Sequence, residues 1–234
     1  MPSLGRRLVA EALGTFTFVF TGAAVVVVNG GFPSHGIGLL GIALAHAVAL
    51  SVMVTATMTI SGGHLNPAVT VGLLVARRID PVSAAAYIGT QLASASLGAL
   101  LVKLLLPATA VRSTLLGVPV IASSVTLEQA IGIEVILTFF LMSAVFGTAV
   151  SLEAPRVGGF GIGLVVLFGV LVGGPLTGAA MNPARAFGPA LVSGQWLGHI
   201  VYWVGPIAGA VLAALLWQYV LLPKVPVQRR RKTD

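Results

Sequence analysis

The sequence predicts an all-α membrane protein with six transmembrane helices and two re-entrant half-helices in an inverted repeat. Three observations lead to this fold class. Hydrophobic residues make up 57% of the 234 residues and charged residues only 8%, whereas a water-soluble domain carries about 25% charged residues. Six long apolar stretches follow one another along the chain, and the tripeptide Asn-Pro-Ala interrupts apolar sequence twice.

Each apolar stretch is long enough for one membrane crossing, which takes roughly 20 helical residues. The first could also pass for a signal peptide, but its apolar sequence continues through Val28, which favours an uncleaved span. The longest connection, 107–127, holds Pro107 and Pro119 and is expected to be an external loop. The expected spans are 7–29, 36–60, 82–106, 128–150, 158–175 and 197–222.

An even number of spans places both termini on one side, and the basic residues indicate which side. Lys and Arg gather in cytoplasmic loops and near anionic headgroups. Such residues are found here near both termini and in short loops that share that side: Arg6, Arg7, Arg77, Arg78, Arg156 and the tail 223–234. Both termini are therefore expected in the cytoplasm. The net charge of +7 comes without a motif for reading or stacking bases, so no nucleic-acid partner is expected.

The chain also matches itself. Three segments of the first half resemble three of the second: 11–22 with 134–147, 61–70 with 177–186, and 87–101 with 202–216. Each half contains three spans, an odd number, so the second half must cross the membrane upside down. The chain 1–234 is expected to form one transmembrane channel domain with repeats of about 1–110 and 128–222. Inverted repeats with broken helices in corresponding places indicate a site at the repeat interface.

The breaks lie at Asn66-Pro67-Ala68 and Asn182-Pro183-Ala184. About ten apolar residues follow each; as a helix they reach about 15 Å, half of the roughly 30 Å hydrocarbon layer. Asn suits a helix N-cap and Pro the first helical position. Two half-helices entering from opposite faces would meet at the midplane with their positive dipole ends together.

This arrangement selects a small neutral solute that forms hydrogen bonds. Each capping Asn is expected to use its oxygen on the helix and to leave two N–H donors free for the solute's oxygen. Water held by such donors points its own hydrogens away, which interrupts proton relay. Cations, including protons, also meet two positive helix ends.

The two motifs, 116 residues apart, the Arg after the second and the "ExxxTF" pattern in the first and fourth spans resemble the aquaporin (major intrinsic protein) family over essentially the whole chain. The resemblance implies a homotetramer in membrane lipid, with one pore per subunit. It also implies a filter of His46, Val170, Ala179 and Arg185. This set is similar to that of plant tonoplast intrinsic proteins, some of which also pass ammonia, whereas water-restricted members place an aromatic residue first and a His second.

The expected function is therefore a passive channel for water that excludes protons and ions, with ammonia, hydrogen peroxide or urea as secondary solutes. A glycerol facilitator is the first alternative, but such members carry Asp and a polar residue where this chain has Ala186 and Ala190. An ion-coupled transporter that uses Glu11 and Glu134 as a proton relay is the second. The expected role of these two carboxylates, and of His64 and Gln91, is to hold the re-entrant loops.

No enzyme is expected, because paired carboxylates, HExxH and GxSxG are absent from the sequence. No metal site and no cofactor are expected either, and there is no cysteine. The short termini resemble those of prokaryotic members and favour a prokaryotic inner membrane, although the vacuolar type of filter leaves an organelle membrane open.

Overall fold

A computed structural model describes residues 2–151 and 157–223. Six helices in these ranges are long and apolar enough to cross a membrane, as predicted. Residues 152–156 and 224–234, which include Arg156 and most of the basic tail, lie outside the described residues. The six spans are α1 Leu4–Gly31, α2 Gly38–Thr57, α4 Pro81–Leu105, α6 Leu127–Val145 extended by η3 Phe146–Val150, α7 Phe160–Thr177, and α9 Val201–Leu216 extended by η4 Trp217–Leu221.

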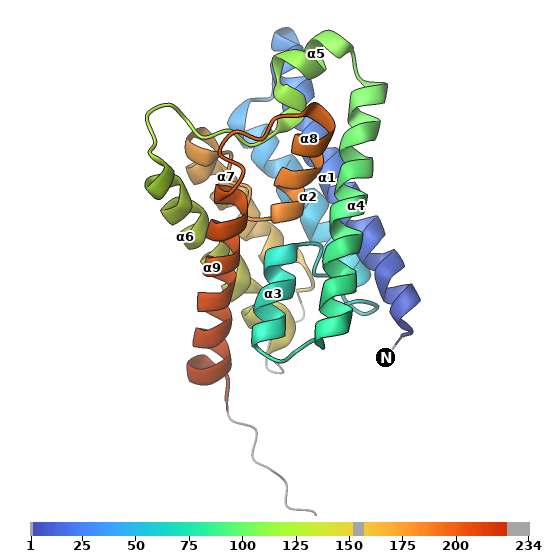
Figure 1. Cartoon of the computed structure of the whole chain (residues 1–234), viewed down its shortest axis with the longest axis vertical. Coiled ribbons are helices and arrows are strands. Elements are labelled where there is room, and N and C mark those ends of the chain that lie inside the picture. The colour runs from blue at the N-terminus through green and yellow to red at the C-terminus, as the bar shows by residue number, and fades with distance from the viewer. Residues whose placement is uncertain (1, 152–156, 224–234) are drawn as a thin grey trace, which may run out of the picture.

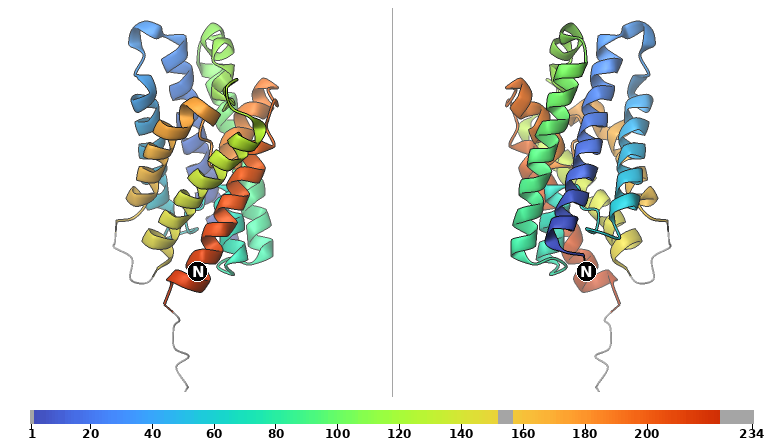
Figure 2. Two further views of the ribbon diagram at one scale, coloured as in Figure 1. Left: turned by 90° about the vertical axis from the view of Figure 1, so that its left-hand side faces the viewer. Right: turned by 90° about the vertical axis from the view of Figure 1, so that its right-hand side faces the viewer.

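Two shorter helices begin at the prolines of the motifs: α3 Pro67–Val75 and α8 Pro183–Ser193. Their nine and eleven residues are too few to cross a bilayer. They lie one above the other inside the bundle, and their N-termini face each other near its middle (Figure 1). The N-terminus and the end of α9 lie at the same end of the bundle (Figure 2), as the even number of spans requires. We call this the terminal end, and the other the distal end.

The two halves are interlocked. Helix α3 packs mainly on α9 and α8 mainly on α4, so each half-helix lies against the third span of the other half. Two glycines permit this: a Cβ on Gly188 would lie 2.4 Å from the carbonyl oxygen of Ala95, and one on Gly72 would lie 3.1 Å from that of Ala210. The remaining extensive contacts pair α6 with α9, α1 with α4, and α2 with α7.

The connection 107–127 differs from the plain loop that its prolines predicted. It contains the short helix α5 Ala108–Ser113 and the turn η2 Leu115–Gly117. Both pack on α1, where a Cβ on Gly31 would lie 2.3 Å from that of Ala110. This segment is therefore fixed by burial against α1, and the local sequence does not predict that contact. A second short turn, η1 Pro33–His35, joins α1 to α2.

Candidate functional site

The site begins where the two half-helices meet. Asn66 caps α3 by accepting a hydrogen bond from the Ala68 amide at 2.8 Å, and Pro67 follows in the first turn. Asn182 caps α8 in the same way, with the Ala184 amide at 2.9 Å, followed by Pro183. Both asparagines are buried. The predicted caps are therefore confirmed.

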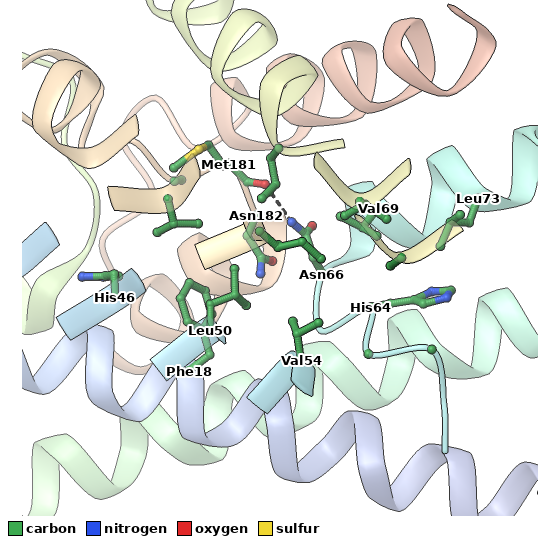
Figure 3. Close-up of a pocket in the computed structure, with 18 of the residues that line it drawn as sticks. Phe18, His46, Leu50, Val54, His64, Asn66, Val69, Leu73, Met181 and Asn182 are labelled. Carbon is green, nitrogen blue, oxygen red and sulfur yellow. Dashed lines mark hydrogen bonds between the residues drawn. The ribbon is translucent and has the colours of Figure 1, made fainter. Parts of the chain in front are cut away.

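The expectation of two free N–H groups on each Asn is wrong. The Asn66 amide nitrogen donates to the carbonyl oxygen of Met181 at 2.8 Å (Figure 3), and that of Asn182 donates to Leu65 at 2.9 Å. Leu65 and Met181 both have a φ of 50°, and this left-handed conformation belongs to the turn whose carbonyl meets the opposite Asn. Each amide thus keeps one N–H without a partner among residues 2–151 and 157–223.

Glu11 holds the loop before α3. Its carboxylate accepts hydrogen bonds from the Ser61 hydroxyl at 2.6 Å and from the amides of His64 and Leu65 at 3.0 and 2.7 Å. The Gln91 side chain donates to the same carboxylate at 2.9 Å. A non-helical loop buried in a membrane protein must find partners for its N–H groups, and Glu11 provides them.

Glu134 repeats this arrangement nearly atom for atom before α8. It accepts from the Thr177 hydroxyl at 2.7 Å and from the amides of Ala180 and Met181 at 2.9 and 2.8 Å. The hydroxyl of Tyr202 donates to the Thr177 carbonyl oxygen at 2.8 Å, just as Tyr87 donates to that of Ser61. Both glutamates are fully buried, and neither lines the cavity described next.

A narrow cavity lies beside the two capping residues, Asn66 and Asn182. The space open to the centre of a water molecule is about 30 Å³, and one water needs at least about 10–15 Å³ by this measure. One side is apolar, built from α2, α3, α6 and α7. Polar groups come from His46, His64 and the two caps (Figure 3). Its apolar lining includes Leu50, Val54, Val69, Leu73, Leu141 and Val166.

At the terminal end the cavity adjoins a wider vestibule of about 750 Å³, which shares His64 as a lining residue. Arg7, Arg77 and Arg78 line the vestibule. The His64 ring stands edge-on to Tyr87 with 5.0 Å between ring centroids, and its Nδ1 lies 3.1 Å from the Thr70 hydroxyl. The His64 side chain therefore packs in the loop, as predicted. His64 also lines both the cavity and the vestibule.

The structure brings two of the four predicted filter residues to the cavity. His46 and Ala179 line it, whereas Val170 and Arg185 are buried nearby but are not among its lining residues. Arg185 instead donates from Nη1 to the Gly117 carbonyl oxygen at 2.7 Å, which holds the guanidinium toward the connection 107–127. Val170 belongs to the apolar core around the cavity.

His46 is oriented by two neighbours that the sequence did not single out as functional. Its Nδ1 lies 2.9 Å from the carbonyl oxygen of Ile42; because a carbonyl can only accept, this nitrogen carries the proton and Nε2 is left as an acceptor. The ring lies against Gly22 of α1, where a Cβ would come within 2.6 Å of Nε2. The sequence shows Gly22 only as a small residue within an apolar span, and only its pairing with His46 in space reveals its role.

The sequence also indicates no role for Gly117, whose carbonyl accepts the hydrogen bond from Arg185. It follows Leu115 and Leu116, which have positive φ values of 50° and 57°, and this left-handed turn directs its carbonyl to Arg185. The leucine side chains give no sequence signal for such a turn. Among the described residues, no group of three His, Asp or Glu is placed to hold a metal ion.

Comparison with known proteins agrees with this geometry. Residues 1–217 match the family described as major intrinsic protein. "Aquaporin TIP4-4" from Zea mays is 45% identical over 223 residues, covering 91% of this chain and 85% of that protein. "Probable aquaporin TIP3-2" from Arabidopsis thaliana is 42% identical over 240 residues, covering 96% and 86%.

A solved structure, the aquaglyceroporin from Plasmodium falciparum, shares the fold with a TM-score of 0.82 at 24% identity, covering 93% of this chain and 97% of that one. The family match over residues 1–217 agrees with the six spans and the two capped half-helices. On this evidence the chain belongs to the major intrinsic protein family.

Proposed function

We propose that this chain is a passive channel for water. The observation that carries the proposal is the meeting of two capping amides beside a cavity with room for water. Each amide has one N–H without a partner among the residues that the structure describes. Relatives that are 45% and 42% identical are named aquaporins, which supports the same function. The solute moves down its gradient, and no step requires a proton or ion.

Proton exclusion follows from the caps. A water molecule at the midplane accepts hydrogen bonds from the free N–H groups of Asn66 and Asn182, so its own hydrogens point away along the path. The chain of donors and acceptors then reverses direction at this point and cannot pass a proton on. The positive ends of α3 and α8 and the guanidinium of Arg185 add an electrostatic barrier to cations.

The filter is proposed at His46, Val170, Ala179 and Arg185. The Nε2 of His46 offers an acceptor, and Arg185 supplies donors that the Gly117 carbonyl does not occupy. Val170 and Ala179 are small and apolar, so this wall is wider than one carrying a large ring. Ammonia fits such a filter as a secondary solute, and hydrogen peroxide and urea are further candidates.

Glu11 and Glu134 are proposed as supports of the two loops rather than as a proton relay. Their oxygens accept the loop N–H groups, and Gln91 and His64 complete the support of the first loop. We further propose a homotetramer in membrane lipid, with the whole chain 1–234 as one channel domain and both termini in the cytoplasm. The relatives compared are plant proteins and lend no support to a prokaryotic inner membrane, which stays a prediction.

Stopped-flow light scattering on proteoliposomes tests the proposal. Vesicles with the protein should shrink faster after an osmotic step than empty vesicles of the same size; equal rates would contradict a water channel. His46→Phe should lower ammonia permeability more than water permeability, because the larger ring narrows the filter and removes Nε2. Arg185→Val should raise the proton leak. Equal ammonia permeability with and without the protein would remove ammonia from the solutes.

A further inference from the structure

A groove at the distal end of the bundle, which shares no described lining residue with the cavity beside the caps, has a composition that the channel does not explain. It lies between the end of α4, helix α5 and the end of α8, and its volume is about 480 Å³. Its walls combine Leu104, Val111 and Leu115 with two cations, Lys103 and Arg112. No carboxylate from the described part of the chain lines it. The groove therefore combines an apolar wall with two positive charges that no negative charge in its described lining balances.

Its two cations are out of place for a membrane protein. In the part of the chain that the structure describes, Arg6, Arg7, Arg77 and Arg78 lie at the terminal end and Arg185 is buried. Lys103 and Arg112 are the remaining Lys and Arg residues there, and both are exposed. They lie in the last turns of α4 and α5, and α5 lies at the distal end (Figure 1). Positive residues are sparse on the non-cytoplasmic side of membrane proteins, so two of them lining one groove favour an anionic ligand.

Both side chains have donors to offer. The Lys103 ammonium donates one hydrogen bond to the Val192 carbonyl oxygen at 2.9 Å, which holds it at the end of α8 and leaves two N–H groups. Arg112 has no side-chain hydrogen bond or ion pair among residues 2–151 and 157–223, and a guanidinium carries five N–H donors in a fork that matches phosphate oxygens.

The position of the groove at the end of a spanning helix favours lipid as its occupant. Lys103 lies in the last turn of α4, which ends at Leu105, and the end of a spanning helix is expected near the boundary between hydrocarbon and headgroups. Leu104 and Leu105 at the end of α4 are 68% and 66% exposed, and Leu97 and Leu100 are exposed earlier in the same helix. A free anion would use the cations and leave this apolar surface uncovered.

We propose that the groove binds an anionic phospholipid of the leaflet on the distal side. Its phosphate lies between Lys103 and Arg112, and the first methylenes of one acyl chain cover Leu104 and Leu115. This site is separate from the pore and does not depend on which solute the channel conducts.

Quenching by brominated lipid tests the proposal. The chain has no cysteine, so Gln195→Cys, on the wall of the groove, gives a single attachment point for a bimane fluorophore. The labelled protein is reconstituted in phosphatidylcholine with the same small fraction of either brominated phosphatidylglycerol or brominated phosphatidylcholine. The anionic lipid should quench more strongly, with an enrichment at the groove on the order of tenfold for two cations.

Two double variants separate charge from packing. Lys103→Gln with Arg112→Gln should abolish the preference for the anionic lipid, while Lys103→Arg with Arg112→Lys should retain it. Water permeability should be unchanged in both, which reports an intact fold, and the single variant Arg112→Gln should show a partial loss if the double variant is poorly folded. A bimane at Ser34→Cys, in the distal turn between α1 and α2, should be quenched equally by both lipids.

Equal quenching at position 195 by the two brominated lipids would overturn the proposal, and so would a preference that survives the glutamine pair. Inorganic phosphate added at an ionic strength matched with sodium chloride should leave the preference intact. If phosphate alone removes it, the cations bind the free anion and the assignment to lipid is wrong.

Discussion

At the scale of single residues, each capping asparagine connects three parts of the molecule. Its oxygen starts its own half-helix, one N–H holds the loop of the other repeat, and its side chain also lines the cavity. The two cross-repeat bonds join positions 115 and 117 residues apart in sequence. Each Asn therefore couples the integrity of the fold to the chemistry of the pore.

Asn182→Asp tests this coupling. The substitution keeps the cap acceptor but removes both N–H donors, so the buried Leu65 carbonyl faces a carboxylate oxygen instead of a donor. We expect a loss of stability of about 1–3 kcal/mol or more, since a buried acceptor loses its partner, together with slower water flow. Thermal unfolding in detergent and stopped-flow permeability measure the two effects.

Asn29→Asp is the matched control for that variant. The Asn29 oxygen accepts from the Gly38 amide at 2.8 Å at an exposed site, and no bond there uses its N–H groups, so Asp preserves the contact. This variant should unfold at nearly the wild-type temperature. Equal losses in the two variants would show that the cross-repeat bond contributes nothing.

Gly22 sets the position of His46. In Gly22→Ala the new methyl group would lie 2.6 Å from Nε2, so the imidazole must move toward the path. We expect a changed ratio of ammonia to water permeability in a folded protein. Gly132→Ala, at a helical glycine with open space around it, should leave the ratio unchanged; a ratio equally unchanged in Gly22→Ala would contradict the proposed role of His46.

At the scale of elements, the short helices depend on close backbone contact. A helix of about ten residues is marginal by itself in water, and neither α3 nor α8 spans the hydrocarbon. Each is stabilised by its cap, by the glutamate that holds the preceding loop, and by packing on the third span of the opposite half. Gly72 and Gly188 occupy equivalent places in these two contacts.

The repeat offers a graded test of that packing. At Gly188 an added methyl group would meet backbone, the Ala95 carbonyl oxygen at 2.4 Å; at Gly72 it would first meet the flexible end of Met142 at 2.8 Å. Gly188→Ala should therefore destabilise the protein by roughly 1–3 kcal/mol, and Gly72→Ala by less. Unfolding temperatures of the two purified variants give the order, and the reverse order would contradict the description of these contacts.

At the scale of the whole molecule, the two halves share a backbone scheme but differ in the side chains around their re-entrant loops. Where the first half has His64, Thr70 and Gln91, the equivalent positions of the second carry Ala180, Ala186 and Pro206. The loop before α3 is therefore supported by more polar side chains than the loop before α8. The buried carboxylates of Glu11 and Glu134 accept hydrogen bonds from the loops in both halves, and neither lines the cavity.

This arrangement predicts passive and symmetric transport. Water should flow at the same rate inward and outward for osmotic steps of equal size, and a sodium gradient or a pH gradient across the vesicle should not drive it. Reversing the step in proteoliposomes and then imposing each gradient without an osmotic difference provides the measurement. Net movement under a proton gradient alone would favour the coupled transporter.

The sequence alone determined the six spans, both half-helices, their caps and the inverted repeat. These features depend on hydropathy, span length and an N-cap followed by Pro, all of which act within a few residues. The glutamates and the filter positions came from spacing and resemblance. Of the filter positions, the structure brings His46 and Ala179 to the cavity and leaves Val170 and Arg185 outside its lining.

Only the tertiary structure decided where the remaining polar groups go. The second bond of each Asn, the Gly117 carbonyl that holds Arg185, and the room that Gly22 makes for His46 all join segments far apart in sequence. The expectation of two free donors per Asn failed for the same reason. A buried hydrogen-bonding group takes whichever partner the packed chain brings within about 3 Å, and local sequence does not specify that partner.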